Sequence, residues 1–155
     1  MNKPIIDLMD DKISQLERYN EVTAQIISED IDSVGDLIAE RQRIITAMDG
    51  ISMDIKEFIS NQSIERRDTL DRLMHFEEIG ELNGEMLEVQ DKIRRIKALR
   101  EEIMRNDDRA MGRLRKERDE LKAKLEGTAK SKQVVNYFSQ STVDVTKGSR
   151  FNTSN

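Results

Sequence analysis

Apolar residues recur at intervals of seven along residues 31–59, and this pattern limits the possible folds more than any other feature of the chain. They form three neighbouring columns: Leu37, Ile44, Ile51 and Phe58; Ile31, Ile38, Ile45 and Ile59; and Val34, Met48 and Ile55. Seven residues make about two turns of an α-helix, so each column lies along one face. A stripe three columns wide exceeds the seam of a two-stranded coiled coil. It predicts packing against two or more neighbouring helices.

The boundaries of the other helices follow from a few residues. Pro4 is the only proline, so no proline interrupts the rest of the chain. We predict helices over residues 4–28, 30–60 and 84–126, with a further helical piece that Ser63 is suited to cap. Gly80 and Gly84 precede the last long helix, and the sequence leaves open whether they interrupt it. Gly127 is the expected helix stop.

The expected fold class is therefore all-α. We predict an elongated antiparallel bundle of three long, coiled-coil-like helices over residues 1–126 and a flexible C-terminal tail over residues 127–155. At about 1.5 Å per residue, the last helix would be about 65 Å long and the first shorter than about 40 Å. We therefore expect the charged second half of the last helix to project beyond the body.

The charge distribution favours some partners over others. Residues 1–60 carry thirteen acidic and six basic side chains, a net charge of −7; residues 61–126 carry −1 and the tail +3, which gives −5 in all. An acidic body does not favour binding to nucleic acid. The first residues hold no apolar run long enough for a signal peptide, and no stretch approaches the ~20 apolar residues of a membrane span. We expect a soluble, cytoplasmic protein without membrane insertion.

Residues suited to catalysis or metal binding are scarce. The chain has no cysteine, and His75 is its only histidine. Arg72 stands where a helical di-metal motif would place a glutamate three residues before the histidine. The glycines are isolated, so no phosphate-binding loop is present. We expect no enzymatic activity, no cofactor and no metal site.

One apolar cluster lies where a bundle does not require it. Val134, Val135, Tyr137 and Phe138 follow the expected helix stop, within a tail rich in Ser, Thr, Asn and Lys. One interpretation is that this cluster folds back on the bundle as a short cap. The other is that it binds a partner together with the end of the last helix, since segments that order on binding use such apolar faces. The predicted partner-binding residues are Leu121, Leu125, Val134, Val135, Tyr137 and Phe138.

Three stretches resemble the FlgN-type flagellar export chaperones, which escort hook-associated (hook–filament junction) subunits. They are the first helix with Leu16, Glu17 and Tyr19; residues 28–45, with an acidic turn and a basic-Gln pair before an apolar pair; and residues 81–87, an Asn-containing step into the last helix. Tyr137 and residues 149–151 are similar to the family's tails. The resemblance covers roughly residues 5–105 and scattered tail positions.

The resemblance implies a binding function without turnover. A chaperone of this type masks an amphipathic helix of a hook-associated subunit, prevents its premature assembly, and releases it at the type III export apparatus of the flagellum. Such a protein is expected to be a monomer or a weak homodimer. The alternative that the residues leave open is a structural coiled-coil protein that self-associates through the same helices. Oligomeric state would separate these two interpretations.

Overall fold

The computed structural model describes residues 3–126. Over this range the chain is helical and contains no strand. Its elements are α1 (Ile5–Ser28), the 3₁₀ turn η1 (Ile31–Ser33), α2 (Val34–Ser60), α3 (Ile64–Met74) and α4 (Gly84–Leu125). The predicted all-α class is confirmed, with four packed α-helices in the part of the chain that is described. α4 ends two residues before Gly127.

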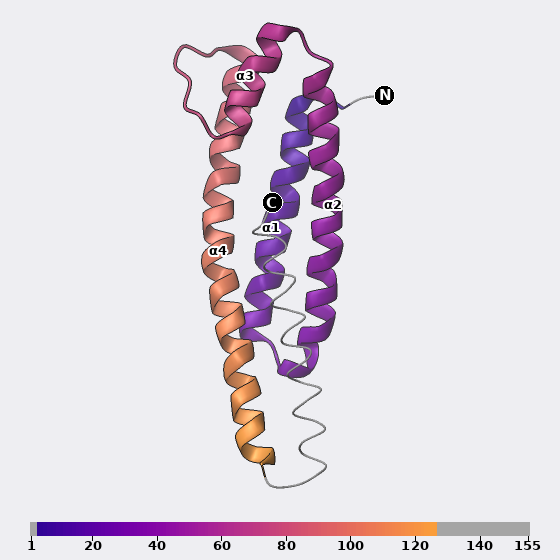
Figure 1. The fold of residues 1–155 in the computed structure, drawn as a ribbon, viewed down its shortest axis with the longest axis vertical. Helices are drawn as coiled ribbons and strands as arrows, with labels where there is room; N and C mark the ends of the chain where they lie inside the picture. Colours follow the sequence, from indigo (N-terminus) through magenta and orange to yellow (C-terminus); the bar gives the residue numbers. More distant parts are fainter. Residues whose placement is uncertain (1–2, 127–155) are drawn as a thin grey trace.

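The long helices lie side by side along the long axis of the molecule, with α1 between the other two (Figure 1). α1 packs along both α2 and α4, whereas α2 and α4 make few contacts with each other. α3 sits at the end of the bundle where α2 finishes. At the opposite end α4 continues past the connection between α1 and α2 (Figure 1). Only the end of the last helix therefore projects, and not its whole second half as predicted, because Ala110, Met111 and Leu114 are buried against α1 and α2.

Two buried clusters hold the helices together. The larger cluster extends from Ile5 to Val22 on α1 and includes Ile44 and Ile55 of α2, as well as Ile96 of α4. The smaller cluster lies at the η1 end and contains Ile26, Val34, Ala110, Met111 and Leu114. The wide stripe of α2 contributes to both clusters. On α1, Ile5 is buried and Ile6 is only partly so.

Helix ends show how the backbone groups of this chain find partners. The side chain of Ser63 accepts a hydrogen bond from the Arg66 N–H, as predicted. Ser33 precedes α2, but its side chain makes no capping bond because η1 leads directly into the helix. α1 has no basic residue in its last turn, and Arg113 of α4 donates to the Ile26 carbonyl oxygen at 2.6 Å. This contact satisfies a carbonyl that the helix itself leaves free.

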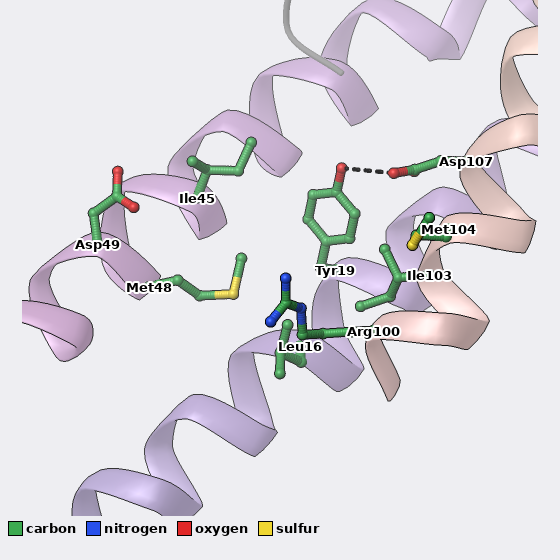
Figure 2. A pocket seen from close by; sticks show the side chains of 9 residues that line it. All are labelled: Leu16, Tyr19, Ile45, Met48, Asp49, Arg100, Ile103, Met104 and Asp107. Carbon is green, nitrogen blue, oxygen red and sulfur yellow. Dashed lines mark hydrogen bonds between the residues drawn. The ribbon is translucent and has the colours of Figure 1, made fainter. Parts of the chain in front are cut away.

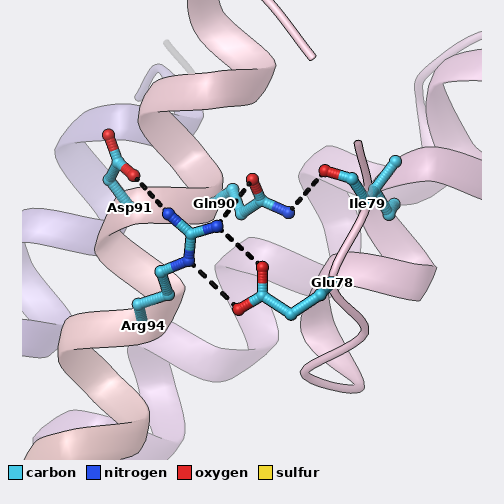
Figure 3. A network of polar contacts seen from close by, with 5 residues as sticks. All are labelled: Glu78, Ile79, Gln90, Asp91 and Arg94. Carbon is cyan, nitrogen blue, oxygen red and sulfur yellow. Dashed lines mark hydrogen bonds and ion pairs between the residues drawn. The ribbon is translucent and has the colours of Figure 1, made fainter. Parts of the chain in front are cut away.

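The glycines before the last helix mark a real interruption. α3 ends at Met74, and α4 begins at Gly84 with φ of +55°, a conformation that strains other residues. Figure 3 shows how the connection is tied to α4: Arg94 makes two bonds to Glu78, at 3.1 and 2.7 Å, and the buried Gln90 donates to the Ile79 carbonyl at 3.0 Å. Hydrogen bonding from Arg94 lowers the pKa of Glu78.

The cap on α3 gives a first testable effect. We expect Ser63→Ala to lower the free energy of unfolding by about 0.5–1 kcal/mol, because the Arg66 N–H loses its acceptor. Ser63→Asp keeps an acceptor at the same position and should match the wild type in urea denaturation. Equal stability of the alanine and aspartate variants would contradict a capping role.

Candidate functional site

An apolar groove lies between α2 and α4 and has α1 as its floor. It contains a cavity of about 270 Å³. Leu16 and Tyr19 come from the floor, Ile45 and Met48 from the α2 wall, and Ile103 and Met104 from the α4 wall (Figure 2). The groove exists because α1 separates two helices that hardly touch each other. The Met104 side chain at its rim is 61% exposed, which is unusual for a large apolar residue inside a helix pair.

A buried polar cluster closes one end of this groove. Arg41 of α2 donates a hydrogen bond to the Tyr19 hydroxyl, and its guanidinium carbon lies 4.6 Å from the centre of the Tyr19 ring. The Tyr19 hydroxyl donates to Asp107 Oδ2 at 3.4 Å, as Figure 2 shows. Arg41 Nη2 lies 3.3 Å from Asp107 Oδ1. Three side chains from three helices therefore meet at one point.

The surroundings of this cluster disfavour the charged form of the Asp107 side chain. Burial raises the pKa of Asp107, although the Arg41 charge and the Tyr19 hydrogen bond both act to lower it. Asp107 Oδ1 makes no hydrogen bond to any described group, despite the nearby guanidinium. We conclude that the 3.3 Å contact is a charge interaction without hydrogen-bond geometry. The cluster fixes the relative position of the helices more than it stabilises them.

Next to it, a second polar contact joins α1 to α4. Asn20 falls within the apolar seam of α1, and the Asn106 amide donates to its side-chain oxygen at 2.6 Å. A polar pair inside an apolar interface permits one register of the two helices and penalises shifted ones. This contact thus fixes the position of α4 along α1, and with it one wall of the groove.

Two of the six predicted partner-binding residues are described, and they do not line the groove. Leu121 and Leu125 are partly buried and sit near the far end of α4, beyond the smaller cluster. Leu121 is about 26 Å from Met104 along the helix. Val134, Val135, Tyr137 and Phe138 lie outside the described residues. The structure therefore places the two described residues, Leu121 and Leu125, away from the groove.

Sequence reasoning missed the residues that shape the groove. Arg41 lies seven residues from both Val34 and Met48, in the third apolar column of α2, and it is only 7% exposed. A charged residue within an apolar column predicts a buried partner of opposite charge, and this signal could have identified Arg41. Nothing in the sequence singles out Asp107 among the many charges of α4.

Other kinds of site find no support in residues 3–126. No group of three or more His, Asp or Glu side chains in this range is arranged to hold a metal ion. Within the same range, none of the helices combines the length and the apolar character needed to cross a bilayer. Comparison with protein-family models, curated proteins and solved structures finds no match to this chain.

Proposed function

We propose that this chain is a chaperone that holds an amphipathic helix of a client protein in the groove between α2 and α4. The observation that carries the proposal is the groove itself, a largely apolar hollow with α1 as its floor and α2 and α4 as its walls. A client helix would lay its apolar face into this channel as a further member of the bundle. Met48 and Met104 are flexible, polarisable side chains that adapt to different apolar surfaces.

The resemblance described above suggests the client class. Within this proposal the clients are flagellar hook-associated subunits, and binding in the cytoplasm prevents their premature assembly before type III export. The finer architecture, an antiparallel bundle of three long helices with a tail, belongs to the same proposal. So does a contact of the end of α4 and the tail with the client or the export apparatus, through Leu121, Leu125 and the cluster at residues 134–138.

Binding measurements test this function directly. Fluorescently labelled peptides spanning the C-terminal helices of the host's hook-associated subunits should bind one-to-one and gain helicity in circular dichroism. Met104→Asp places a charge at the groove rim and should weaken binding at least tenfold, because that charge must lose water when the client docks. Met104 is exposed, so the fold should be unaffected.

Met53→Asp provides the matched control. Met53 is 71% exposed on α2 and does not line the cavity. This variant should bind the peptides as the wild type does. If Met104→Asp also binds like the wild type, the groove is not the client site. Stable oligomers in light scattering, without peptide binding, would support the alternative of a self-associating coiled-coil protein.

A further inference from the structure

Three positive side chains from three helices flank one end of the groove. Arg100 lines the cavity from α4. Lys12 lies four residues before the cavity-lining Leu16 on α1, and Lys56 lies seven residues after Asp49 on α2. Residues four and seven apart share a helix face, so both lysines point along the side of their helix that borders the groove. We call Lys12, Lys56 and Arg100 the cationic rim.

The three side chains of the cationic rim form no ion pair with any residue of the described part of the chain. Nearby cations of α4 do have one: Lys92 Nζ lies 2.5 Å from Asp10 Oδ1, and Arg94 binds Glu78. Arg100 instead packs on the face of the Phe76 ring, with its guanidinium carbon 5.4 Å from the ring centre.

These charges are close enough to repel one another. The pKa of Lys12 is lowered, first by burial and then by the positive charges of Arg100 and Lys56. Asp49 lies on the α2 wall of the cavity, and within residues 3–126 it forms no ion pair with any of them. An acidic chain with a net charge of −5 thus keeps three cations without an ion-pair partner among the described residues beside a largely apolar groove. Such a cluster costs stability in the free protein and favours an anionic occupant.

We infer that the cationic rim selects client helices that carry a carboxylate beside their apolar anchor residues. The inference rests on the proposed function and names the chemistry of the client. Lys12 is one helical turn from Leu16, and Lys56 is about two turns from Met48. The client's Asp or Glu therefore lies one to two turns from the side chain that fills the cavity. There it forms charge-assisted hydrogen bonds in a partly desolvated setting.

Neutralising Lys12 separates a binding role from a structural one. Lys12→Gln removes a partly buried charge that repels two neighbours, so we expect a higher melting temperature. The same variant should bind an acidic hook-associated peptide about five- to tenfold more weakly. A residue with only a structural role would not raise stability and lower affinity together. A variant that is more stable but binds the peptide as tightly as the wild type would overturn the inference.

Charge reversal provides the second test. Arg100→Glu should weaken binding of the acidic peptide at least tenfold. A peptide with Glu→Lys at the contacting position should recover most of the lost affinity for this variant. Arg105→Glu makes the same charge change on the same helix, about 140° around the axis from Arg100, and should leave binding within twofold. Peptides with Glu→Gln should bind the wild type five- to tenfold more weakly.

The outcomes distinguish the two proposals. If peptides bind with equal affinity whatever their charge, the cationic rim does not select the client, and the groove function stands. If no peptide binds the wild-type chain, the groove function fails and the inference fails with it. Recovery by the Glu→Lys peptide on Arg100→Glu, without recovery on Arg105→Glu, would establish the contact.

Discussion

Asp107→Ala is expected to lower the free energy of unfolding by about 3 kcal/mol, one of the two largest effects that the structure predicts for a single substitution. The side chain of Arg41 is 9% exposed, and Asp107 is its only ion-pair partner among the described residues. Removing the carboxylate leaves a buried guanidinium without a counter-charge, which typically costs 3–5 kcal/mol. The value is placed at the lower end because Asp107 is itself 18% exposed.

Replacing the whole cluster should have the opposite effect. Because burial raises the pKa of Asp107 despite the Arg41 charge, the ion pair does not offset the cost of removing the carboxylate from water. The variant Tyr19→Phe/Arg41→Met/Asp107→Leu should therefore be as stable as the wild type or more stable. Met at position 41 would continue the apolar column between Val34 and Met48.

The raised pKa also gives the sign of the pH dependence. A folded carboxyl whose pKa lies above the ordinary value of about 3.9 binds its proton more tightly than the unfolded chain does. Its contribution to stability is complete below the ordinary pKa and is lost as pH rises through the raised one. The advantage of the triple variant over the wild type should therefore be largest at neutral pH and shrink on acidification.

Urea denaturation from pH 4 to pH 7 measures these differences. Asp108→Ala changes the neighbouring, exposed carboxylate and should shift the unfolding free energy by no more than about 0.5 kcal/mol. A triple variant less stable than the wild type would show that the cluster stabilises the fold. In that case its role would not be limited to fixing the helix positions.

The helices could be predicted from the sequence because they depend on local patterns. The sevenfold columns predicted α2, with an end at Ser60 as observed, and Pro4 and Gly127 bracketed the described helices. The break between α3 and α4 could not be decided in advance. A glycine within a helix and a glycine that starts one after a loop look alike in sequence, and only the φ of +55° at Gly84 separates them.

The groove could not be predicted from the sequence, since it depends on how α2 and α4 are placed relative to each other across α1. The width of the α2 stripe indicated more than one neighbour, but it did not show that α4 lies across α1 from α2. In the sequence, Met104 looks like an ordinary apolar residue of an amphipathic helix. Its exposure follows only from the arrangement of the three long helices. The sequence instead drew attention to the tail, where an apolar cluster stands out against polar neighbours.

The second large effect concerns α3, which closes one end of the bundle. Leu73→Ala is expected to lower the free energy of unfolding by about 3 kcal/mol, because Leu70 and Leu73 are fully buried and are the two buried residues of this helix. A helix of eleven residues is not stable in water by itself, so it depends on this packing. The loss corresponds to a fall in melting temperature of roughly 10 °C.

Hydrogen exchange shows where that loss occurs. In Leu73→Ala, amides of α3 should exchange much faster, while those in the α1–α4 interface keep most of their protection, because α3 contacts the rest of the bundle through few residues. Ile64→Ala is the matched control on the same helix, since Ile64 is 80% exposed and should change the unfolding free energy by less than about 0.5 kcal/mol. Uniform loss of protection in Leu73→Ala would mean that α3 and the bundle unfold as one unit. In that case α3 would not separate from the bundle while the rest of the chain stays folded. The client would then have to bind to a groove whose α3 end does not open.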